Sequence, residues 1–300
     1  MYDIIIIGAG PAGLTASIYA RRSNKKVLVL EARTYGGQIA NVLDIENYPV
    51  EPHISGFDFA TKIYNQALDL GAEIKFEKVI DIKDGEVKEV ITTKETYKTK
   101  TIIIATGAEN RKLGLPNESE LLGKGVSYCA TCDGPFYKNK EIAVVGGGDS
   151  AIEEAVYLSN IASKVYLIHR KSELNNNSPF IDELNKKENI EIILNSNVTS
   201  LNKNEVLESI DVTDKENNVR NIKVSCLFIA VGRVPDNENF AKLINTDKIG
   251  YIIANENCHT NVDGIFVAGD NRTKSLRQLV TATSDGAIAA TEAIKYINKK

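Results

Sequence analysis

Residues 2–13 read YDIIIIGAGPAG, and this stretch decides the fold that the rest of the chain must join. It begins with a run of β-branched isoleucines, which is typical of a strand buried on both faces of a parallel sheet. Gly8, Gly10 and Gly13 follow with the spacing G-x-G-x-x-G, and the next residues, LTASIYARRS, have the composition of a helix. The segment therefore predicts a strand, a glycine turn and a helix in direct succession.

A second strand is expected at KVLVLE, which ends in Glu31. A glycine pattern between a strand and a helix, with an acid at the end of the next strand, is the context of a dinucleotide-binding turn. Its glycines allow the tight turn, the approach of the backbone to a pyrophosphate and close helix–strand packing. The pyrophosphate would meet free N–H groups at the helix N-terminus. Glu31 would bind a ribose diol and repel a 2′-phosphate, so this site suits FAD or an NAD-type adenosine.

The same pattern occurs again in KNKEIAVVGGGDSAIEEAVYLSNIASKVYLIHRK, where Gly146, Gly148 and Ala151 replace the three glycines. This second unit ends in His-Arg-Lys at 169–171 rather than in an acid. Two copies of one nucleotide-binding unit predict two dinucleotide sites, or one working site and one vestigial site.

The segment GIFVAGDNRTKSLRQLVTATSDGAIAATEAIKYI follows the second unit but resembles an end-piece of the first. We therefore expect an α/β protein with two Rossmann-like three-layer nucleotide-binding domains, the second inserted into the first. The expected first domain is discontinuous, with residues 1–112 and 241–300, and the second covers residues 113–240. Proline and glycine near RKLGLPNESELLGKG and the stretch VGRVPDNENF mark the crossings.

Composition restricts the function classes. The net charge is −4 and 43% of residues are hydrophobic, without the clustered Lys and Arg of a nucleic-acid-binding or anionic-membrane surface. The apolar run near the N-terminus is too short for a membrane span and follows an acid rather than a basic segment, so no signal peptide is predicted. We expect a cytoplasmic protein.

The cysteines provide the strongest chemical signal. Cys129 and Cys132 form a C-x-x-C in YCATCDG, while Cys226 and Cys258 read as ordinary buried thiols. A zinc site would need further ligands, and the chain has only three histidines and no second C-x-x-C, so no metal is expected. The spacing instead favours a redox pair, and the next residue, Asp133, offers a carboxyl for acid–base work or simply a turn residue. A flavin can pass two electrons to such a disulfide.

Together these motifs resemble the low-molecular-weight thioredoxin reductases of bacterial type, a family of flavoprotein disulfide reductases. The resemblance rests on GAGPAG (8–13), GGQ (36–38), ATGA (105–108), CATCDG (129–134), GGGDSA (146–151) and AGD…RQ…TATSDGAIAA (268–290), and it extends over essentially the whole chain. It implies a homodimer that reduces thioredoxin, with Cys129 and Cys132 as the redox disulfide and Asp133 as acid–base. It implies a pyridine-nucleotide turn at Gly146, Gly148 and Ala151. The residues implied to bind FAD are Gly8, Gly10, Gly13, Glu31, Gly37, Gln38, Asn47, Thr106, Asp270, Arg277 and Gln278.

The sequence departs from the family at its 2′-phosphate clamp, H-R-R-x-x-x-R. Here the clamp begins with His169, Arg170 and Lys171, and Asn175 stands in place of the last arginine. Lysine keeps the charge but loses the bidentate fork. Losing one hydrogen bond to a charged group weakens binding of NADPH by about 10- to 150-fold. Three donors stay open: NADPH bound less tightly, NADH, and reduced ferredoxin, which serves a related branch of the family. Asn271 is a second departure, and the sequence offers no physical reason for it.

Other function classes are also open. A redox-silent binding protein on this scaffold would be expected to lack a cysteine or the acid, and both are present. A flavin disulfide reductase for a different thioredoxin-like or peroxidase partner protein remains an alternative, because residues that dock a partner leave no motif.

Overall fold

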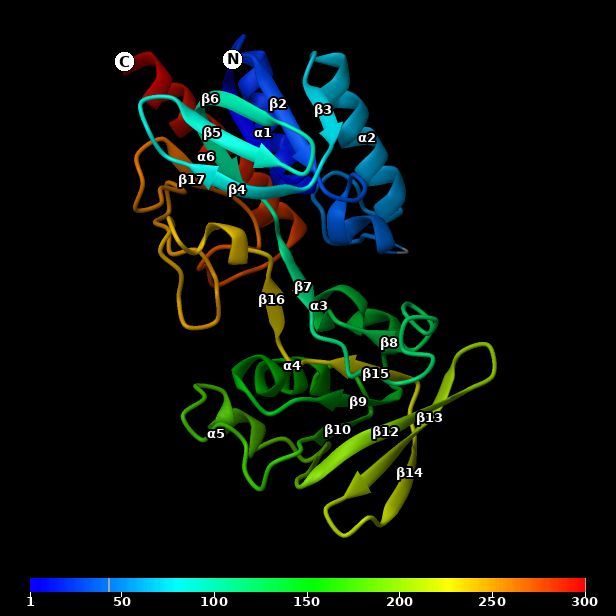
Figure 1. Cartoon of the computed structure of the whole chain (residues 1–300). Helices are drawn as coiled ribbons and strands as arrows, with labels where there is room; N and C mark the ends of the chain where they lie inside the picture. The colour runs from blue at the N-terminus through cyan, green and yellow to red at the C-terminus, as the bar shows by residue number, and fades with distance from the viewer. Residues whose placement is uncertain (43, 300) are drawn as a thin grey trace. The chain divides into compact units, whose positions relative to one another are not determined.

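The computed structural model describes residues 1–42 and 44–299 and divides the chain into two compact units (Figure 1). The first unit comprises Met1–Glu109 and Val234–Lys300, and the second comprises Asn110–Arg233. The second unit is thus inserted into the first. The domain boundaries expected from the sequence, after residues 112 and 240, stay predictions. The two crossing segments pair as a short two-stranded sheet, β7 (Ala108–Asn110) with β16 (Arg233–Pro235).

The first unit is built on a seven-stranded sheet in the order β3-β2-β1-β6-β5-β4, with β17 also paired to β6. Strands β1, β2, β3, β6 and β17 are joined by parallel pairings, and β4, β5 and β6 by antiparallel pairings. Its elements are β1 (Tyr2–Ile7), α1 (Pro11–Arg22), β2 (Val27–Glu31), α2 (Gly56–Asp69), β3 (Glu73–Phe76), β4 (Val79–Lys83), β5 (Lys88–Thr92), β6 (Thr96–Ile104), β17 (Ile265–Val267) and α6 (Leu279–Lys299).

The isoleucine run explains the layers of this unit. Ile4 and Ile6 pack with α1 and α6 on one face of the sheet, while Ile5 and Ile7 pack on the other face with residues of β4, β5 and the C-terminal segment. All are nearly or fully buried, because alternate residues of a strand point to opposite faces. The three-layer arrangement follows from this continuous apolar run.

Helices α1 and α6 lie unusually close because their contact surfaces carry small residues. A Cβ atom on Gly286 of α6 would lie 2.2 Å from the carbonyl oxygen of Ala12 in α1. Ala289, Ala290 and Ala293 continue this buried stripe along α6. The stripe explains the small-residue composition of the C-terminal segment.

The second unit has a five-stranded parallel sheet in the order β11-β10-β9-β15-β8 and a three-stranded antiparallel sheet, β12-β13-β14. Helices α3 and α4 contribute to the apolar cluster on one face of the parallel sheet, and the antiparallel sheet contributes to the cluster on the other. Its elements are β8 (Val126–Ser127), α3 (Ala130–Asp133), β9 (Glu141–Val145), α4 (Asp149–Ser159), β10 (Lys164–Ile168), α5 (Ile181–Leu184), β11 (Ile190–Ile193), β12 (Ser196–Lys203), β13 (Leu207–Asp214), β14 (Val219–Lys223) and β15 (Cys226–Ile229).

The predicted fold class is confirmed: each unit has a parallel sheet at its centre and a glycine turn between its first central strand and the following helix. Among residues 1–42 and 44–299, no helix combines the length and apolar character that a membrane crossing requires.

The close packing of α1 and α6 yields the first prediction. Gly286→Ala should lower the free energy of unfolding by about 1–3 kcal/mol, because the new methyl group forces the helices apart. Urea unfolding followed by circular dichroism measures this. Ser284→Ala, at an exposed position of the same helix, should change stability by less than about 0.5 kcal/mol. Equal stability of the two variants would contradict this account of the packing.

Candidate active site

The first glycine turn has the shape that a phosphate-binding turn requires. Gly8 has φ 108°, and a Cβ there would lie 2.3 Å from the carbonyl oxygen of Ala105. A Cβ on Gly13 would lie 1.9 Å from the carbonyl oxygen of Gly8. Gly10, which precedes α1, has no described heavy atom within 4 Å of such a Cβ. The turn is closed on the protein side and open at Gly10, where the first N–H groups of the helix need partners.

Glu31 is held beside this turn by backbone hydrogen bonds. Its Oε2 accepts from the N–H of Ala9 at 2.8 Å, and its Oε1 accepts from the N–H of Arg33 at 2.8 Å. Each carboxylate oxygen can accept more than one hydrogen bond. Glu31 therefore keeps acceptor capacity for a ligand such as a ribose diol.

A second glycine pair borders the same turn. The N–H of Gly36 donates to the carbonyl oxygen of Ala9 at 2.8 Å. A Cβ on Gly37 would lie 3.5 Å from the Cα of Gly10, so Gly37 and the adjoining Gln38 begin a 3-10 helix next to the open side of the turn. The structure thus brings the GGQ motif and the first glycine turn together.

Two further predicted residues meet farther along the chain. Asn47 donates from Nδ2 to Oε1 of Gln278 at 3.2 Å. This contact joins the loop ahead of α2 to the start of α6, although 231 residues separate the two positions.

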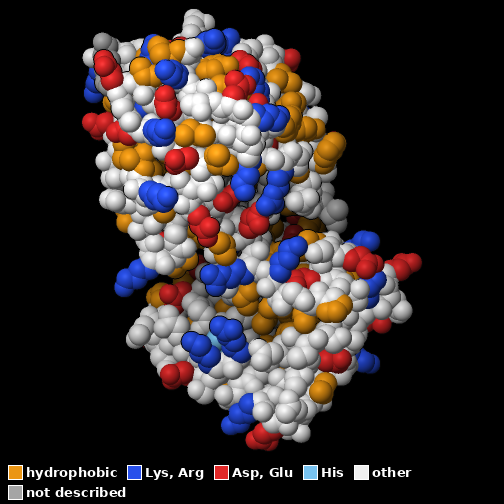
Figure 2. Space-filling view, viewed as in Figure 1, with side chains coloured by type: hydrophobic (Ala, Val, Ile, Leu, Met, Phe, Trp, Pro, Cys, Tyr) orange, Lys and Arg blue, Asp and Glu red, His pale blue; other side chains and the backbone are white. Residues whose placement is uncertain are grey.

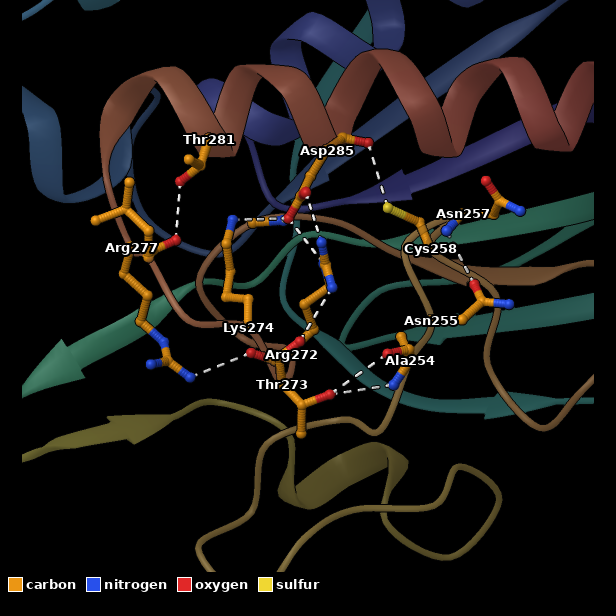
Figure 3. Close-up of polar contacts among 12 residues, drawn as sticks. Ala254, Asn255, Asn257, Cys258, Arg272, Thr273, Lys274, Arg277, Thr281 and Asp285 are labelled. Carbon is orange, nitrogen blue, oxygen red and sulfur yellow. Dashed lines mark hydrogen bonds and ion pairs between the residues drawn. The ribbon is translucent and has the colours of Figure 1, made fainter. Parts of the chain in front are cut away.

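The turn Ala268-Gly269-Asp270 is fixed by a buried ion-pair cluster between Asp285 of α6 and two cations of the loop that precedes the helix (Figure 3). Asp285 accepts a bidentate pair of hydrogen bonds from Arg272, at 2.9 and 2.8 Å, and one from Lys274 at 2.9 Å. The N–H of Gly269 also donates to the Asp285 carboxylate, at 3.0 Å. The three charged side chains are at most 7% exposed, so one carboxylate compensates two buried cations. Burial opposes ionisation of Asp285, but the hydrogen bonds from Arg272 and Lys274 hold its pKa below the ordinary carboxyl value.

Arg277 joins the same loop. Its guanidinium donates to the backbone oxygens of Asp270, at 3.4 Å, and Arg272, at 3.3 Å, and lies 4.2 Å from the ring centre of Tyr251. These contacts hold the arginine against Asp270, its neighbour in the predicted FAD site.

Asn271, unexplained by the sequence, belongs to a buried polar network. Its Nδ2 donates to Thr106 Oγ1 at 3.0 Å and also lies 3.4 Å from Asn237 Oδ1. Asn237 in turn donates to the backbone oxygen of Asn271 at 2.8 Å. The Oδ1 of Asn271 finds no hydrogen-bond partner among the described residues. Asn271 therefore connects Thr106, a residue of the predicted FAD site, to Asn237, which lies shortly after β16.

These contacts connect the residues predicted to bind FAD into one part of the first unit. The open turn at Gly10, the acceptor capacity of Glu31 and the fixed loop at Asp270 fit a dinucleotide with a pyrophosphate and a ribose. The roles of the individual residues stay predictions.

The second glycine turn repeats the geometry of the first. Gly146 has φ 151°, and a Cβ there would lie 2.3 Å from the carbonyl oxygen of Ala230 and 2.7 Å from the Cβ of Ala151. Gly148 precedes α4, and no described heavy atom lies within 4 Å of a Cβ built on it. This turn, too, is open where the helix begins.

The predicted clamp lies next to the second turn. The ring of His169 covers Gly147, where a Cβ would lie 2.3 Å from the imidazole. Burial lowers the pKa of His169, and the charges of Lys171 and Arg170 lower it further, which favours the neutral ring. Arg170 and Lys171 are exposed and form no ion pair with the described residues. Figure 2 shows basic side chains gathered near a histidine on the surface of the second unit.

Asn175 has a different role from the arginine that it replaces. Its N–H donates to the carbonyl oxygen of Gly147 at 3.0 Å, and its Nδ2 donates to Oδ1 of Asp149 at 2.7 Å. The side chain is therefore committed to the first turn of α4. Glu173 lies nearby in the sequence and accepts a hydrogen bond from Asn176 at 3.3 Å.

Cys129 and Cys132 form a disulfide, with a Cα–Cα distance of 5.3 Å. Cys129 precedes the short helix α3, and its carbonyl oxygen accepts from the N–H of Asp133 at 3.1 Å. Both cysteines are half-buried. A partner molecule therefore has access to the disulfide from solvent, while one side of it rests on the protein.

Asp133 has the environment of a proton-transfer group. Burial raises its pKa above the ordinary carboxyl value, while a hydrogen bond from Ser127 favours the ionised form. The Oγ of Ser127 donates to Oδ2 of Asp133 at 2.6 Å, and it accepts from the N–H of Cys129 at 3.0 Å. The sequence did not identify Ser127, because a serine two residues before a cysteine carries no recognised pattern.

Phe136 is a second residue that the sequence analysis missed. It lies in the 3-10 helix that follows α3, and its side chain is 46% exposed. Large apolar side chains are often exposed singly, so exposure alone is a weak signal. Phe136 follows Cys132 by four residues in the chain.

One surface group has metal-like geometry. Asp44, Glu46 and His53 offer ligand atoms within 4.8 Å of one another. The group is mostly exposed, and His53 Nδ1 already lies 3.0 Å from Asp44 Oδ2. We assign no metal to it.

Comparisons with known proteins give a consistent result. The model of the family "Pyridine nucleotide-disulphide oxidoreductase" matches residues 2–286. A thioredoxin reductase of Listeria monocytogenes is 45% identical over 302 residues, which cover 100% of this chain and 95% of that protein. The crystal structure of a thioredoxin reductase from Streptococcus pyogenes has a TM-score of 0.96 and 40% identity, covering 100% of this chain and 99% of that one. A ferredoxin-flavin thioredoxin reductase from Clostridium acetobutylicum has a TM-score of 0.55 and 30% identity, covering 100% and 99%.

The buried cluster in Figure 3 yields the second prediction. Asp285→Asn should lower the free energy of unfolding by about 3–5 kcal/mol at neutral pH, because two buried cations lose their counter-charge. A depressed folded-state pKa contributes stability that is present above the unfolded pKa and lost as pH falls through the folded pKa. Urea unfolding at several pH values should therefore show the wild-type and variant curves converging in acid.

Asp263→Asn is the matched control, because Asp263 is exposed. It should change stability by less than about 0.5 kcal/mol. A similarly small change for Asp285→Asn, or a gap that does not narrow in acid, would refute the assigned role of the cluster.

Proposed function

Since the chain belongs to the pyridine nucleotide-disulphide oxidoreductase family, we propose that it is an FAD-dependent thioredoxin reductase that uses NADPH to reduce its Cys129–Cys132 disulfide and then reduces oxidised thioredoxin. The observation that carries this proposal is a half-buried C-x-x-C disulfide followed directly by a half-buried carboxyl group, in a unit that also has an open glycine turn. When bound, FAD supplies two-electron transfer between a nicotinamide and a disulfide. The curated relatives are themselves named thioredoxin reductases, which supports thioredoxin as the substrate.

The disulfide cycle balances at the two cysteines. Reduction breaks the S–S bond, and two electrons and two protons convert Cys129 and Cys132 into thiols. One cysteine, as a thiolate, then attacks a sulfur of the thioredoxin disulfide and forms a mixed disulfide. The other cysteine attacks that mixed disulfide, restores the Cys129–Cys132 bond and releases thioredoxin as a dithiol.

Asp133 moves protons in this cycle. A carboxyl group with a raised pKa stays protonated to higher pH than an exposed aspartate, so it can supply a proton to a leaving sulfur. Once ionised, it can take the proton back from a thiol that must become a nucleophile. The hydrogen bond from the N–H of Asp133 to the carbonyl oxygen of Cys129 keeps this carboxyl group on the turn that carries the disulfide.

The disulfide must also be reached by the partner protein. Phe136 presents an exposed aromatic ring close behind the redox turn, where it can contact an apolar rim around a partner's disulfide. The family resemblance further suggests a homodimer, which light scattering of the purified protein would test.

The second glycine turn favours NADPH as the donor. Arg170 and Lys171 are exposed and form no ion pair with residues 1–42 or 44–299, so two cations are available to a 2′-phosphate. The position that would hold a ribose-binding acid in an NADH site is His169 instead. Asn175 supplies no charge and is tied to α4, which predicts weaker NADPH binding than with three cations. Reduced ferredoxin as the donor would leave both cations without a role.

The disulfide yields the third prediction. Cys129→Ser and Cys132→Ser should each abolish NADPH-dependent reduction of thioredoxin while the protein keeps its bound FAD, because one sulfur cannot close the cycle. The assay is insulin reduction coupled to thioredoxin, with flavin absorbance measured on the same samples. Cys258→Ala, at a buried thiol of the first unit, should retain activity. Thioredoxin reduction at the wild-type rate by either serine variant would rule out the proposed function.

The clamp yields the fourth prediction. Arg170→Ala should raise KM for NADPH by about 10-fold or more, because a hydrogen bond to a charged phosphate is lost. KM for NADH, which lacks this phosphate, should be unchanged. Lys215→Ala removes an exposed lysine from the turn between β13 and β14 and should affect neither value. Unchanged KM for NADPH in Arg170→Ala would mean that the phosphate does not bind here.

A further inference from the structure

Ser127 is a buried hydroxyl at the centre of the redox turn. Its side chain lies at the end of β8, where Ser127 pairs with Phe228 of β15, and the residue is 3% exposed. Three polar atoms surround its Oγ: Oδ2 of Asp133 at 2.6 Å, the backbone nitrogen of Cys129 at 3.0 Å and the backbone oxygen of Cys129 at 3.4 Å. The hydroxyl therefore contacts both the acid and the first cysteine.

The hydrogen-bonding capacity of a hydroxyl limits what Ser127 can do. It has one proton to donate and two lone pairs that accept. The N–H of Cys129 uses one lone pair at all times. The single proton can then go to Asp133 Oδ2 or to the carbonyl oxygen of Cys129, but not to both at full strength.

Which acceptor is used depends on whether Asp133 is ionised. An ionised Asp133 can only accept, so Ser127 donates to it. A protonated Asp133 can donate across the same short contact, and the Ser127 proton then turns to the carbonyl oxygen of Cys129. Both states are hydrogen-bonded with the heavy atoms in the same places, so a change in protonation requires only a rotation of one O–H bond.

We propose that Ser127 is the positioning residue for proton transfer at the redox disulfide: its hydroxyl anchors the Asp133 carboxyl group to the Cys129 backbone and, by turning its proton, lets Asp133 gain or lose a proton without moving. This inference rests on the proposed function. In reduction, the S–S bond breaks with two electrons from the donor, an Asp133 O–H bond breaks, an S–H bond forms at a cysteine, and the second proton comes from water. Asp133 then recovers a proton from water.

Two buried groups near Asp133 do not titrate in the same range. The charge of Asp133 acts on Tyr137, in the 3-10 helix after α3, and on Cys226, at the start of β15. Burial raises the pKa of both well above their ordinary values. They stay protonated around neutrality. Cys129 and Cys132 become titratable thiols on the same turn once the disulfide is reduced, so the limb of the pH profile that disappears in Asp133→Asn is the one that reports Asp133.

The experiment compares Ser127→Ala, Ser127→Thr and the wild type. The readout is the pH dependence of NADPH-dependent thioredoxin reduction by the FAD-loaded enzyme. Ser127→Ala removes the hydrogen bond to the ionised carboxylate of Asp133. The limb of the pH–activity profile that reports ionisation of Asp133 should therefore move to higher pH by about one unit. Ser127→Thr keeps the hydroxyl and should keep the wild-type limb. In an Asp133→Asn background, Ser127→Ala should leave the remaining pH profile unchanged.

Ser159→Ala is the matched control, because Ser159 is a buried serine of the same unit whose hydroxyl donates to its own helix at 2.7 Å. It should not move the profile. A loss of stability in Ser127→Ala with an unmoved limb would overturn the inference and leave Ser127 a purely structural residue.

Infrared titration of the carboxyl stretch gives a readout that does not need turnover. The Asp133 band, identified by its absence in Asp133→Asn, should titrate at higher pH in Ser127→Ala than in the wild type, and an identical titration would also overturn the inference. An inactive wild-type enzyme with a shifted infrared titration would refute the proposed function and leave the Ser127–Asp133 coupling in place. An active wild type without either shift would refute only the inference.

Discussion

Two turns of this chain require a glycine because a Cβ atom would collide with the neighbouring strand. A Cβ on Gly8 would lie 2.3 Å from the carbonyl oxygen of Ala105, and one on Gly146 would lie 2.3 Å from that of Ala230. Ala105 directly follows β6, which pairs with β1 in the first unit, and Ala230 directly follows β15, which pairs with β9 in the second. The close approach allows each helix to begin at the carboxyl ends of the parallel strands. There the free N–H groups at the start of the helix can donate hydrogen bonds to a phosphate.

The two units differ in what surrounds this common turn. In the first, Asp285 of α6 forms ion pairs with two buried cations and accepts a hydrogen bond from the N–H of Gly269, which fixes the loop beside the turn. In the second, α3 places a disulfide and a buried carboxyl group on one short segment ahead of the turn. The proposed function needs a fixed site for a cofactor and an accessible pair of cysteines for a partner, and the two copies of one scaffold differ in this way.

Much of the fold could be predicted from the sequence, because isoleucine runs and glycine spacing report local geometry. The duplicated pattern predicted the two nucleotide-binding units, and the C-terminal segment, which resembles an end-piece of the first unit, predicted the insertion. The C-x-x-C spacing predicted a redox pair. Hydrogen bonds between distant residues leave no such pattern. Ser127 forms hydrogen bonds with Asp133 and Cys129, which only the turn brings together. Asn271 forms hydrogen bonds with Thr106 and Asn237, which are distant from it in the chain. Asn175 looked like a lost cation, whereas the structure commits it to the start of α4.

In the proposed cycle, NADPH bound at the second glycine turn supplies the two electrons that reduce the Cys129–Cys132 disulfide to two thiols. The most direct measurement is an anaerobic titration of the oxidised, FAD-loaded protein with NADPH, followed by alkylation and mass spectrometry of the cysteines. The account predicts bleaching of the flavin band and alkylation of Cys129 and Cys132 at near-stoichiometric NADPH, with Cys226 and Cys258 unchanged from the untreated sample. An unbleached flavin and an intact disulfide at large excess of NADPH, with both reduced by ferredoxin instead, would contradict it.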